Sequence, residues 1–493
     1  MSRKNNNRNK TYQRIKQKLW EKKKRREKEL DKRKIQFHEP RIGLPVPRKF
    51  RRYQNTSSNL NKLSNKEISS KKRTLYIKKH LPTNLNYLLN TSESPFNIEK
   101  IRQHNYKSDG VVELPKKFSI IEEPEESYLA IQKTISALLL ENNSSFYLDY
   151  SNCEEIELGS QVLLDIILKD FLRFRNKCQK IDRNHKNYFP SNIGGKNINN
   201  EEVQKLIFSV GSPVTLKVRE EHEFPDIIPY KLCIHDNERE RNYEKRIEQK
   251  ELDTTEMAEY VIKSLARMNK KLTSEKRDDL CTVIGEILIN AEEHSTTKYR
   301  FSIGYFKEVN IENKHYGIFR LVILNFGKTI YEKFKSVDCP NQEIVSKMKS
   351  LSHSYTKRNL FFQREFEEEN LWTLYALQEG VSSMSPTDYK RGNGSIRFID
   401  SFFNIKGSKL IDDISNLTIQ SGKTRIHFNG EYSIVSKINS NKESYKVMTF
   451  NKSGNIEDKP DNRFVYQTKH YFPGTLISAK LLLNDEVVEQ LNN

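Results

Sequence analysis

Three polar residues recur at one-turn spacing in the segment 274–294. Glu286, Asn290 and His294 stand at positions i, i+4 and i+8, and a helix places such positions on one face. An asparagine side-chain oxygen is a hard ligand that suits Mg²⁺, and a glutamate one turn away can orient or deprotonate an attacking water. The spacing therefore indicates metal-assisted hydrolysis, although a solvated helix face gives the same pattern. We interpret His294 as a helix-end residue that interacts with the helix dipole.

The residues around this polar stripe predict one amphipathic helix. Ser274 can cap its start by accepting hydrogen bonds from the first backbone N–H groups. Apolar residues follow at helical spacing and predict a buried face beside the polar one. That face consists of Leu280, Val283, Ile284, Ile287, Leu288 and Ala291.

Three glycine-containing segments follow in a fixed order. The first ends a predicted strand, 319–324. The second lies between two predicted helices, 371–378 and 396–403, and a Gly-x-Gly before a helix lets backbone N–H groups approach phosphate oxygens. The third precedes a predicted strand, 476–482. Their residues are Asn325 and Gly327 in the first, Gly392 and Gly394 in the second, and Gly474 and Thr475 in the third.

The order of these four segments resembles the GHKL superfamily of ATPases over residues 253–483. The resemblance implies an α/β sandwich, with helices over a mixed, mostly antiparallel sheet, that binds ATP and Mg²⁺ under a mobile lid within 331–391. Glu286 would then be the general base and Asn290 the Mg²⁺ ligand. The residues implied in cofactor binding are Asn290, Asn325, Gly327, Gly392, Gly394 and Thr475.

The first glycine segment departs from the family pattern. An aspartate usually accepts a hydrogen bond from the adenine amino group there, whereas this chain has Asn325. A carboxamide oxygen can accept the same bond, but without charge assistance. Lys328 also stands where a further glycine is common. The substitution leaves the choice of nucleotide open.

An α/β segment precedes the expected ATPase domain. A helix over 124–140, a strand over 146–151 and a helix over 158–174 are predicted, and 146–164 resembles the strand, turn and helix of a STAS domain, which we place at 110–235. Phosphorylated members of that family begin the helix with Asp-Ser, whereas this chain has Glu157 and Leu158, with Ser160 nearby. The resemblance implies protein docking rather than a phosphorylation cycle; a generic βα unit is the alternative.

Charge is distributed unevenly along the chain. Residues 1–80 contain 28 Lys/Arg and 6 Asp/Glu, whereas the remaining 413 residues carry 57 and 59. The first 80 residues are interpreted as a flexible basic arm, and the charged run 236–252 as a connector or exposed helix. The arm is either a solvated tail or an electrostatic contact for nucleic acid, with an anionic membrane surface as a third partner.

Composition predicts a cytoplasmic protein. The sequence has no apolar run long enough for a membrane span and no apolar stretch typical of a secretory signal. Its five cysteines are scattered, without a CxxC pair, which disfavours a zinc site or a disulfide framework.

We therefore expect an α+β protein in three parts: the basic arm, a STAS-like domain and, over 253–493, a GHKL-type domain. The predicted function is slow Mg-dependent ATP hydrolysis, in which the state of the lid regulates a protein partner; a co-encoded protein is a candidate. One alternative is a serine/threonine protein kinase of the anti-sigma type. Another is a non-catalytic module that senses nucleotide or binds nucleic acid.

Overall fold

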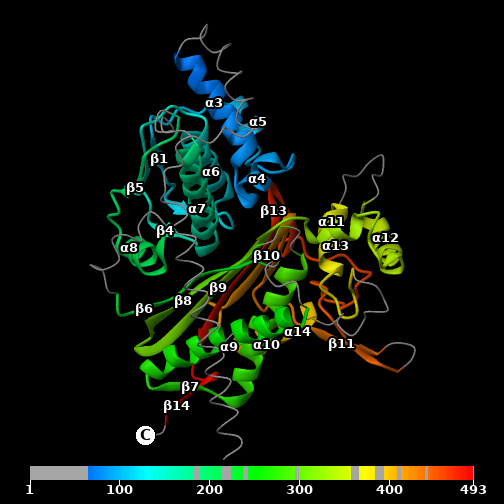
Figure 1. Cartoon of the computed structure of the whole chain (residues 1–493). Coiled ribbons are helices and arrows are strands. Elements are labelled where there is room, and N and C mark those ends of the chain that lie inside the picture. Colours follow the sequence, from blue (N-terminus) through cyan, green and yellow to red (C-terminus); the bar gives the residue numbers. More distant parts are fainter. Residues whose placement is uncertain are drawn as a thin grey trace, which may run out of the picture. The chain divides into compact units, whose positions relative to one another are not determined.

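The computed structural model describes residues 65–181, 188–212, 224–236, 243–294, 297, 299–356, 366–383, 394–407, 412–438 and 442–491. The chain divides into two compact units, Met1–Ile68 and Ser69–Asn493. Almost all of the first lies outside the described residues, so the predicted flexibility of the basic arm is not tested. The second unit is a mixed α+β structure with several sheets (Figure 1).

The α/β part of the second unit, residues 69–212, is built on a three-stranded parallel sheet of order β1-β3-β5. Helix α6 packs on β1 and β3 and also contacts α7. Short strands β2 and β4 form a separate parallel pair. The helices are α3 (Asn65–His80), α4 (Thr83–Asn90), α5 (Ile98–His104), α6 (Pro124–Leu139), α7 (Leu158–Ile181) and α8 (Glu201–Leu206), followed by a π-helical turn, Ile207–Gly211. The strands are β1 (Val111–Glu113), β2 (Lys117–Phe118), β3 (Ser145–Asp149), β4 (Glu155–Ile156) and β5 (Asn192–Lys196).

A five-stranded sheet of order β10-β13-β9-β8-β6 forms the centre of the rest of the unit. Every neighbouring pair in it is antiparallel. The sheet is therefore fully antiparallel, whereas a mixed, mostly antiparallel sheet was expected. Its strands are β6 (Ile227–Asp236), β8 (Tyr299–Ile311), β9 (Lys314–Phe326), β10 (Asn416–Phe428) and β13 (Val465–Leu483). Two smaller antiparallel pairs are β7 (Lys270–Leu272) with β14 (Val488–Gln490) and β11 (Val435–Ile438) with β12 (Ser444–Val447).

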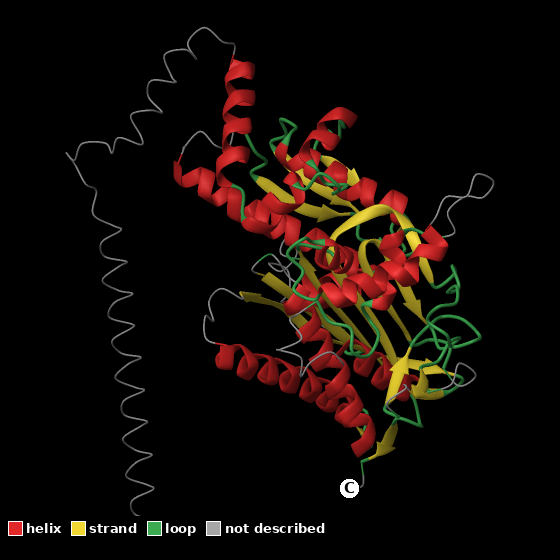
Figure 2. Cartoon of the chain, turned by 90° about the vertical axis from the view of Figure 1, so that its right-hand side faces the viewer, coloured by secondary structure: helices red, strands yellow, loops and turns green. Residues whose placement is uncertain are grey.

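Both faces of this sheet are covered by other parts of the unit. Successive side chains of a strand point to opposite faces, so one strand contributes to two cores. On β9, Leu321 and Ile323 join the core formed with the C-terminal helices. Val322 and Leu324 instead join the core of the α/β part. Figure 2 shows the long strands lying between these two groups of helices. The C-terminal helices are α9 (Tyr243–Arg267), α10 (Ser274–His294), α11 (Ile330–Lys335), α12 (Gln342–Thr356), α13 (Glu368–Tyr375) and α14 (Gly394–Lys406).

The strongly periodic elements lie where the sequence predicts them. Helix α10 spans the predicted range, and five residues of its predicted apolar face are buried: Leu280, Val283, Ile284, Ile287 and Leu288. Helix α7 and strands β9 and β13 also cover their predicted segments, whereas α6 and β3 end one and two residues before their predicted ends. Hydrophobic patterning predicted these elements because each has at least one continuous apolar face.

The predicted boundary between the α/β domain and the ATPase domain is wrong. Strand β6, which the prediction assigned to 110–235, pairs with β8 in the five-stranded sheet. Much of the supposed connector 236–252 forms the first part of α9. Met257 and Val261 of the same helix are fully buried, so α9 is part of the domain and covers the sheet.

One further expectation changes, and another is tested only in part. Residues 71–80, assigned to the flexible arm, lie in α3, where Arg73, Tyr76 and Ile77 are buried. The expected lid, 331–391, contains α11, α12 and α13, with Trp372 fully buried. Helices α11 and α13 pack on the sheet, and α12 packs on α13. The segments 357–365 and 384–391 of this range lie outside the described residues, so the expected lid is not tested.

Candidate functional site

Helices α10 and α14 pack against each other and bring two predicted motifs together. Glu286 lies on α10 with 19% of its side chain exposed, and its Oε1 is 3.9 Å from Nη1 of Arg397 in the first turn of α14. Helix α14 begins at Gly394, as expected for a Gly-x-Gly that opens a helix. The carboxylate proposed as a base is therefore beside the helix start proposed to meet phosphates.

A row of polar residues crosses the sheet on the face that α10 covers. Each of the five strands contributes one, and the strand register makes them direct neighbours. We call this set the polar row. In the order of the strands from β6 to β10 its members are His235, Arg300, Asn325, Thr475 and Ser421.

Asn325 is at the centre of the polar row. Its side chain is fully buried, and neither its Oδ1 nor its Nδ2 has a hydrogen-bond partner among the described residues. Burying an amide without hydrogen-bond partners lowers the free energy of unfolding by about 1–3 kcal/mol. Such groups are therefore rare in the cores of folded proteins. The unsatisfied donor and acceptor make Asn325 a candidate binding residue.

Two glycines bring the backbones of β9 and β13 close together beside Asn325. Gly327 and Gly474 have φ values of 139° and 146°, which favour glycine. The backbone N–H of Gly327 donates to the carbonyl of Pro473 at 3.3 Å. The hydroxyl of Thr475 is 2.9 Å from that of Ser421. The first glycine segment, at the end of β9, thus lies beside the third, in the middle of β13.

Gly474→Ala is expected to destabilise the fold. The added Cβ would overlap the carbonyl oxygen of Asn325, and a non-glycine residue at this φ costs roughly 1–3 kcal/mol in strain alone. Chemical denaturation would measure the lost free energy of unfolding. Gly285→Ala is the control, because its Cβ meets Thr254 at an ordinary 3.5 Å and alanine favours a helix. Equal stability of Gly474→Ala and the wild type would contradict this geometry.

Arg300 was missed in the sequence analysis. It is 1% exposed, its Nη2 is 2.7 Å from Oδ2 of Asp253, and its Nη1 donates to the carbonyl of Leu288 on α10 at 3.3 Å. His235 reaches the same carboxylate oxygen at 3.3 Å. The network ties α9, α10 and two strands together beside Asn325. A cation at an inward position of an apolar strand was the available signal.

The polar groups of the turn before α7 are hydrogen-bonded to one another. The Glu157 carboxylate accepts from the backbone N–H groups of Gly159 and Ser160, at 2.6 and 2.9 Å, and from the Ser160 hydroxyl at 2.8 Å. Burial raises the pKa of Glu157. The Ser160 oxygen also accepts from the backbone N–H of Ile120 at 2.7 Å and is fully buried. This hydroxyl is therefore inaccessible to a phosphoryl donor.

The predicted site residues are thus only partly tested. Glu286, Asn325, Gly327 and Thr475 lie on or around one face of the sheet, and α14 begins at Gly394. The side chains of Asn290 and His294, and all of Gly392, lie outside the described residues. Within the part of the chain that the structure describes, no group of three or more His, Cys, Asp or Glu residues is arranged to hold a metal ion.

Comparisons with known proteins do not assign the chain to a family. No family model, curated protein or solved structure matches it. Among the described helices, none combines the length and apolar character needed to cross a bilayer. The functional argument therefore rests on the geometry of the chain itself.

Proposed function

We propose that this chain binds Mg-ATP in the manner of the GHKL superfamily and hydrolyses it slowly. The observation that carries the proposal is the polar row. On an otherwise apolar face, it places the unsatisfied carboxamide of Asn325 between Arg300 and Thr475. The row lies under α10, the helix that carries Glu286 and Asn290.

Each segment has a chemical role in this proposal. Asn325 would accept or donate a hydrogen bond at the edge of the base, and the N-terminus of α14 would face the phosphates. Asn290 would hold Mg²⁺, which would neutralise the phosphate charge. Glu286 would orient and deprotonate the attacking water. Since Glu286 lies near Arg397, it must leave this cation before it can act as a base.

We further propose that the α/β part is a STAS-like docking module. Its support is the buried Ser160 hydroxyl, already engaged by Glu157 and Ile120, which favours binding over phosphorylation. The α/β part packs on one face of the sheet and the proposed nucleotide site lies on the other. A nucleotide-dependent shift of the strands could therefore alter the docking of a protein partner.

ATP titration of the purified full-length chain tests this function. Binding followed by release of inorganic phosphate without a partner is expected. Transfer of phosphate to a co-purifying protein would favour the kinase alternative, and binding without either reaction would favour a sensing module. Absence of ATP binding in the presence of Mg²⁺ would contradict the proposal.

Asn325→Asp is expected to tighten ATP binding by about fivefold to tenfold. A carboxylate accepts a charge-assisted bond from the adenine amino group, which is stronger than the neutral bond of a carboxamide. Arg300, its neighbour across the strands, would compensate the buried charge. Isothermal titration calorimetry measures the change, with exposed Asn310→Asp on β8 as control. Unchanged affinity in Asn325→Asp would remove this residue from the base site.

A further inference from the structure

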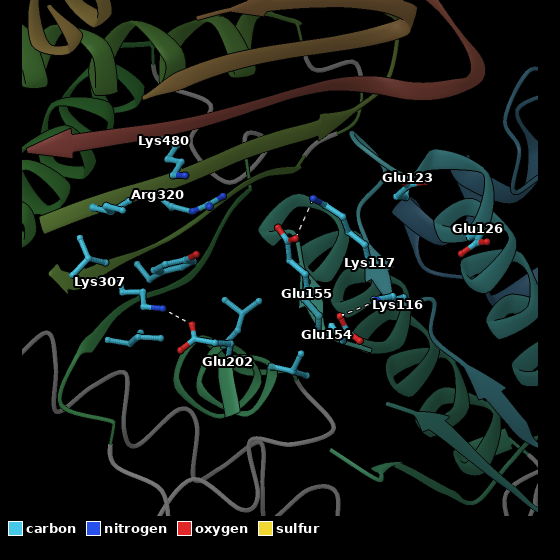
Figure 3. Close-up of a pocket in the computed structure, with 17 residues that line it drawn as sticks. Lys116, Lys117, Glu123, Glu126, Glu154, Glu155, Glu202, Lys307, Arg320 and Lys480 are labelled. Carbon is cyan, nitrogen blue, oxygen red and sulfur yellow. Dashed lines mark hydrogen bonds and ion pairs between the residues drawn. The ribbon is translucent and has the colours of Figure 1, made fainter. Parts of the chain in front are cut away.

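A cleft of about 690 Å³ opens between the α/β part and the opposite face of the five-stranded sheet (Figure 3). Its sheet side includes Tyr305, Lys307, Arg320 and Lys480. A second cavity of about 600 Å³ shares Glu155, Arg320 and Lys480 with it and extends to His427 and Tyr466. Small-molecule sites have volumes of this size. The cleft is separated from the polar row by the thickness of the sheet.

Most of the charges in the cleft are neutralised by a direct partner. Lys117 pairs with Glu155 at 3.0 Å, Lys116 with Glu154 at 3.2 Å, and Lys307 with Glu202. Figure 3 shows these pairs as dashed lines. They join side chains within the α/β part, or the α/β part to β8. Four charged residues of the lining are outside these pairs: Glu123, Glu126, Arg320 and Lys480.

Arg320 and Lys480 are the two cations among these four, and they lie directly opposite each other on β9 and β13. Like charges at such a position destabilise a sheet. Among the described residues, no carboxylate lies within ion-pair distance of either one. Burial, and secondly the charge of Arg320, lower the pKa of Lys480, although the more distant carboxylates of Glu122, Asp412 and Glu155 raise it in part. The chain thus keeps two adjacent cations in a partly buried place where they repel each other.

A bound anion would relieve this repulsion. We propose that the cleft binds a phosphate monoester of a small hydroxylated molecule, with the phosphate between Arg320 and Lys480. The planar guanidinium of Arg320 can bind two phosphate oxygens at once, and the ammonium of Lys480 adds a point charge. Glu155 and Tyr466 line the adjoining space and can hydrogen-bond to hydroxyl groups of the ligand body. This site is independent of the proposed ATP site.

Calorimetric titration of the full-length chain with ribose 5-phosphate tests the proposal, with ribose and inorganic phosphate as the matched probes. We expect ribose 5-phosphate to bind, phosphate to bind more weakly and ribose not to bind. Arg320→Gln and Lys480→Gln should each weaken binding of the phosphate ester at least about tenfold, because each removes a charge-assisted contact. Lys307→Gln is the control: it lines the same cleft but is paired with Glu202, so binding should change less than about twofold.

Thermal unfolding provides a second readout without ligand. Lys480→Gln should raise the melting temperature, since it removes the like-charge repulsion, whereas Lys307→Gln should not. Failure of ribose 5-phosphate to bind the wild type, or equal binding by Arg320→Gln and the wild type, would overturn the proposal. Loss of ATP binding in Asn325 variants with ribose 5-phosphate binding intact would leave it standing, because the two sites lie on opposite faces of the sheet.

Discussion

Glu286→Ala is expected to retain ATP binding and to reduce hydrolysis by about 10²- to 10⁴-fold, the usual contribution of a general base. The side chain lies on α10 beside the start of α14, with only 19% of its surface exposed. Truncation leaves the apolar face of α10 untouched, so the fold should persist. Nucleotide binding would be measured by calorimetry and turnover by phosphate release in the presence of Mg²⁺.

Glu275→Gln is the matched control for this variant. It changes a carboxylate on the same helix, but in the first turn and with 81% of the side chain exposed. Its turnover should equal that of the wild type. If Glu286→Ala hydrolyses ATP at the wild-type rate, Glu286 is not the base. If it loses ATP binding as well, the residue has a role in positioning α14 through Arg397.

If the chain hydrolyses ATP as proposed, the ion pair of Glu286 with Arg397 would help to keep turnover slow. At 3.9 Å the guanidinium attracts the carboxylate, so it would compete with an attacking water for Glu286. A phosphate bound at the start of α14 would compete for the same arginine. Nucleotide binding would thereby release the carboxylate, so that the base becomes active only when ATP is in place.

The elements of this fold could be predicted from the sequence, but their assembly could not. Helix α10 and strands β9 and β13 each contain a long series of regularly spaced apolar residues, and each lies where predicted. Strand β6 was assigned to the wrong domain because its partner, β8, begins more than sixty residues later in the chain. Local patterns contain no information on such pairing.

The same reason limits prediction of the site. Motif order identified Asn325 and Thr475, which the register makes direct partners. The polar row also needs His235, Arg300 and Ser421, which lie in three other strands and match no motif. They become neighbours only through the register of the complete sheet. Likewise, Arg320 and Lys480 are unremarkable surface-type residues in the sequence, and only the pairing of β9 with β13 makes them opposite cations.

Removal of the basic arm is expected to abolish most nucleic-acid affinity. Residues 1–64 contain 22 Lys/Arg and 5 Asp/Glu, all outside the described residues. If six to ten of these cations contact phosphates, raising salt from about 50 to 200 mM should weaken binding by about 10³- to 10⁵-fold, since each contact releases counterions. No sequence feature of the arm is suited to reading base edges, so binding should be largely independent of sequence.

The truncation should begin at Asn65 rather than at Leu81, the first residue after the predicted arm of residues 1–80. Helix α3 is part of the fold: Arg73 donates to the carbonyls of Leu140 and Tyr188 at 2.5 and 2.9 Å, and the side chain is 8% exposed. A chain without α3 would expose that surface and could lose binding through unfolding. Gel-shift titrations at the two salt concentrations compare the full-length and 65–493 chains, with ATP binding as the test of folding. Equal nucleic-acid affinity of the two chains, or none in the full-length protein, would show that the arm has another role, such as contact with an acidic protein.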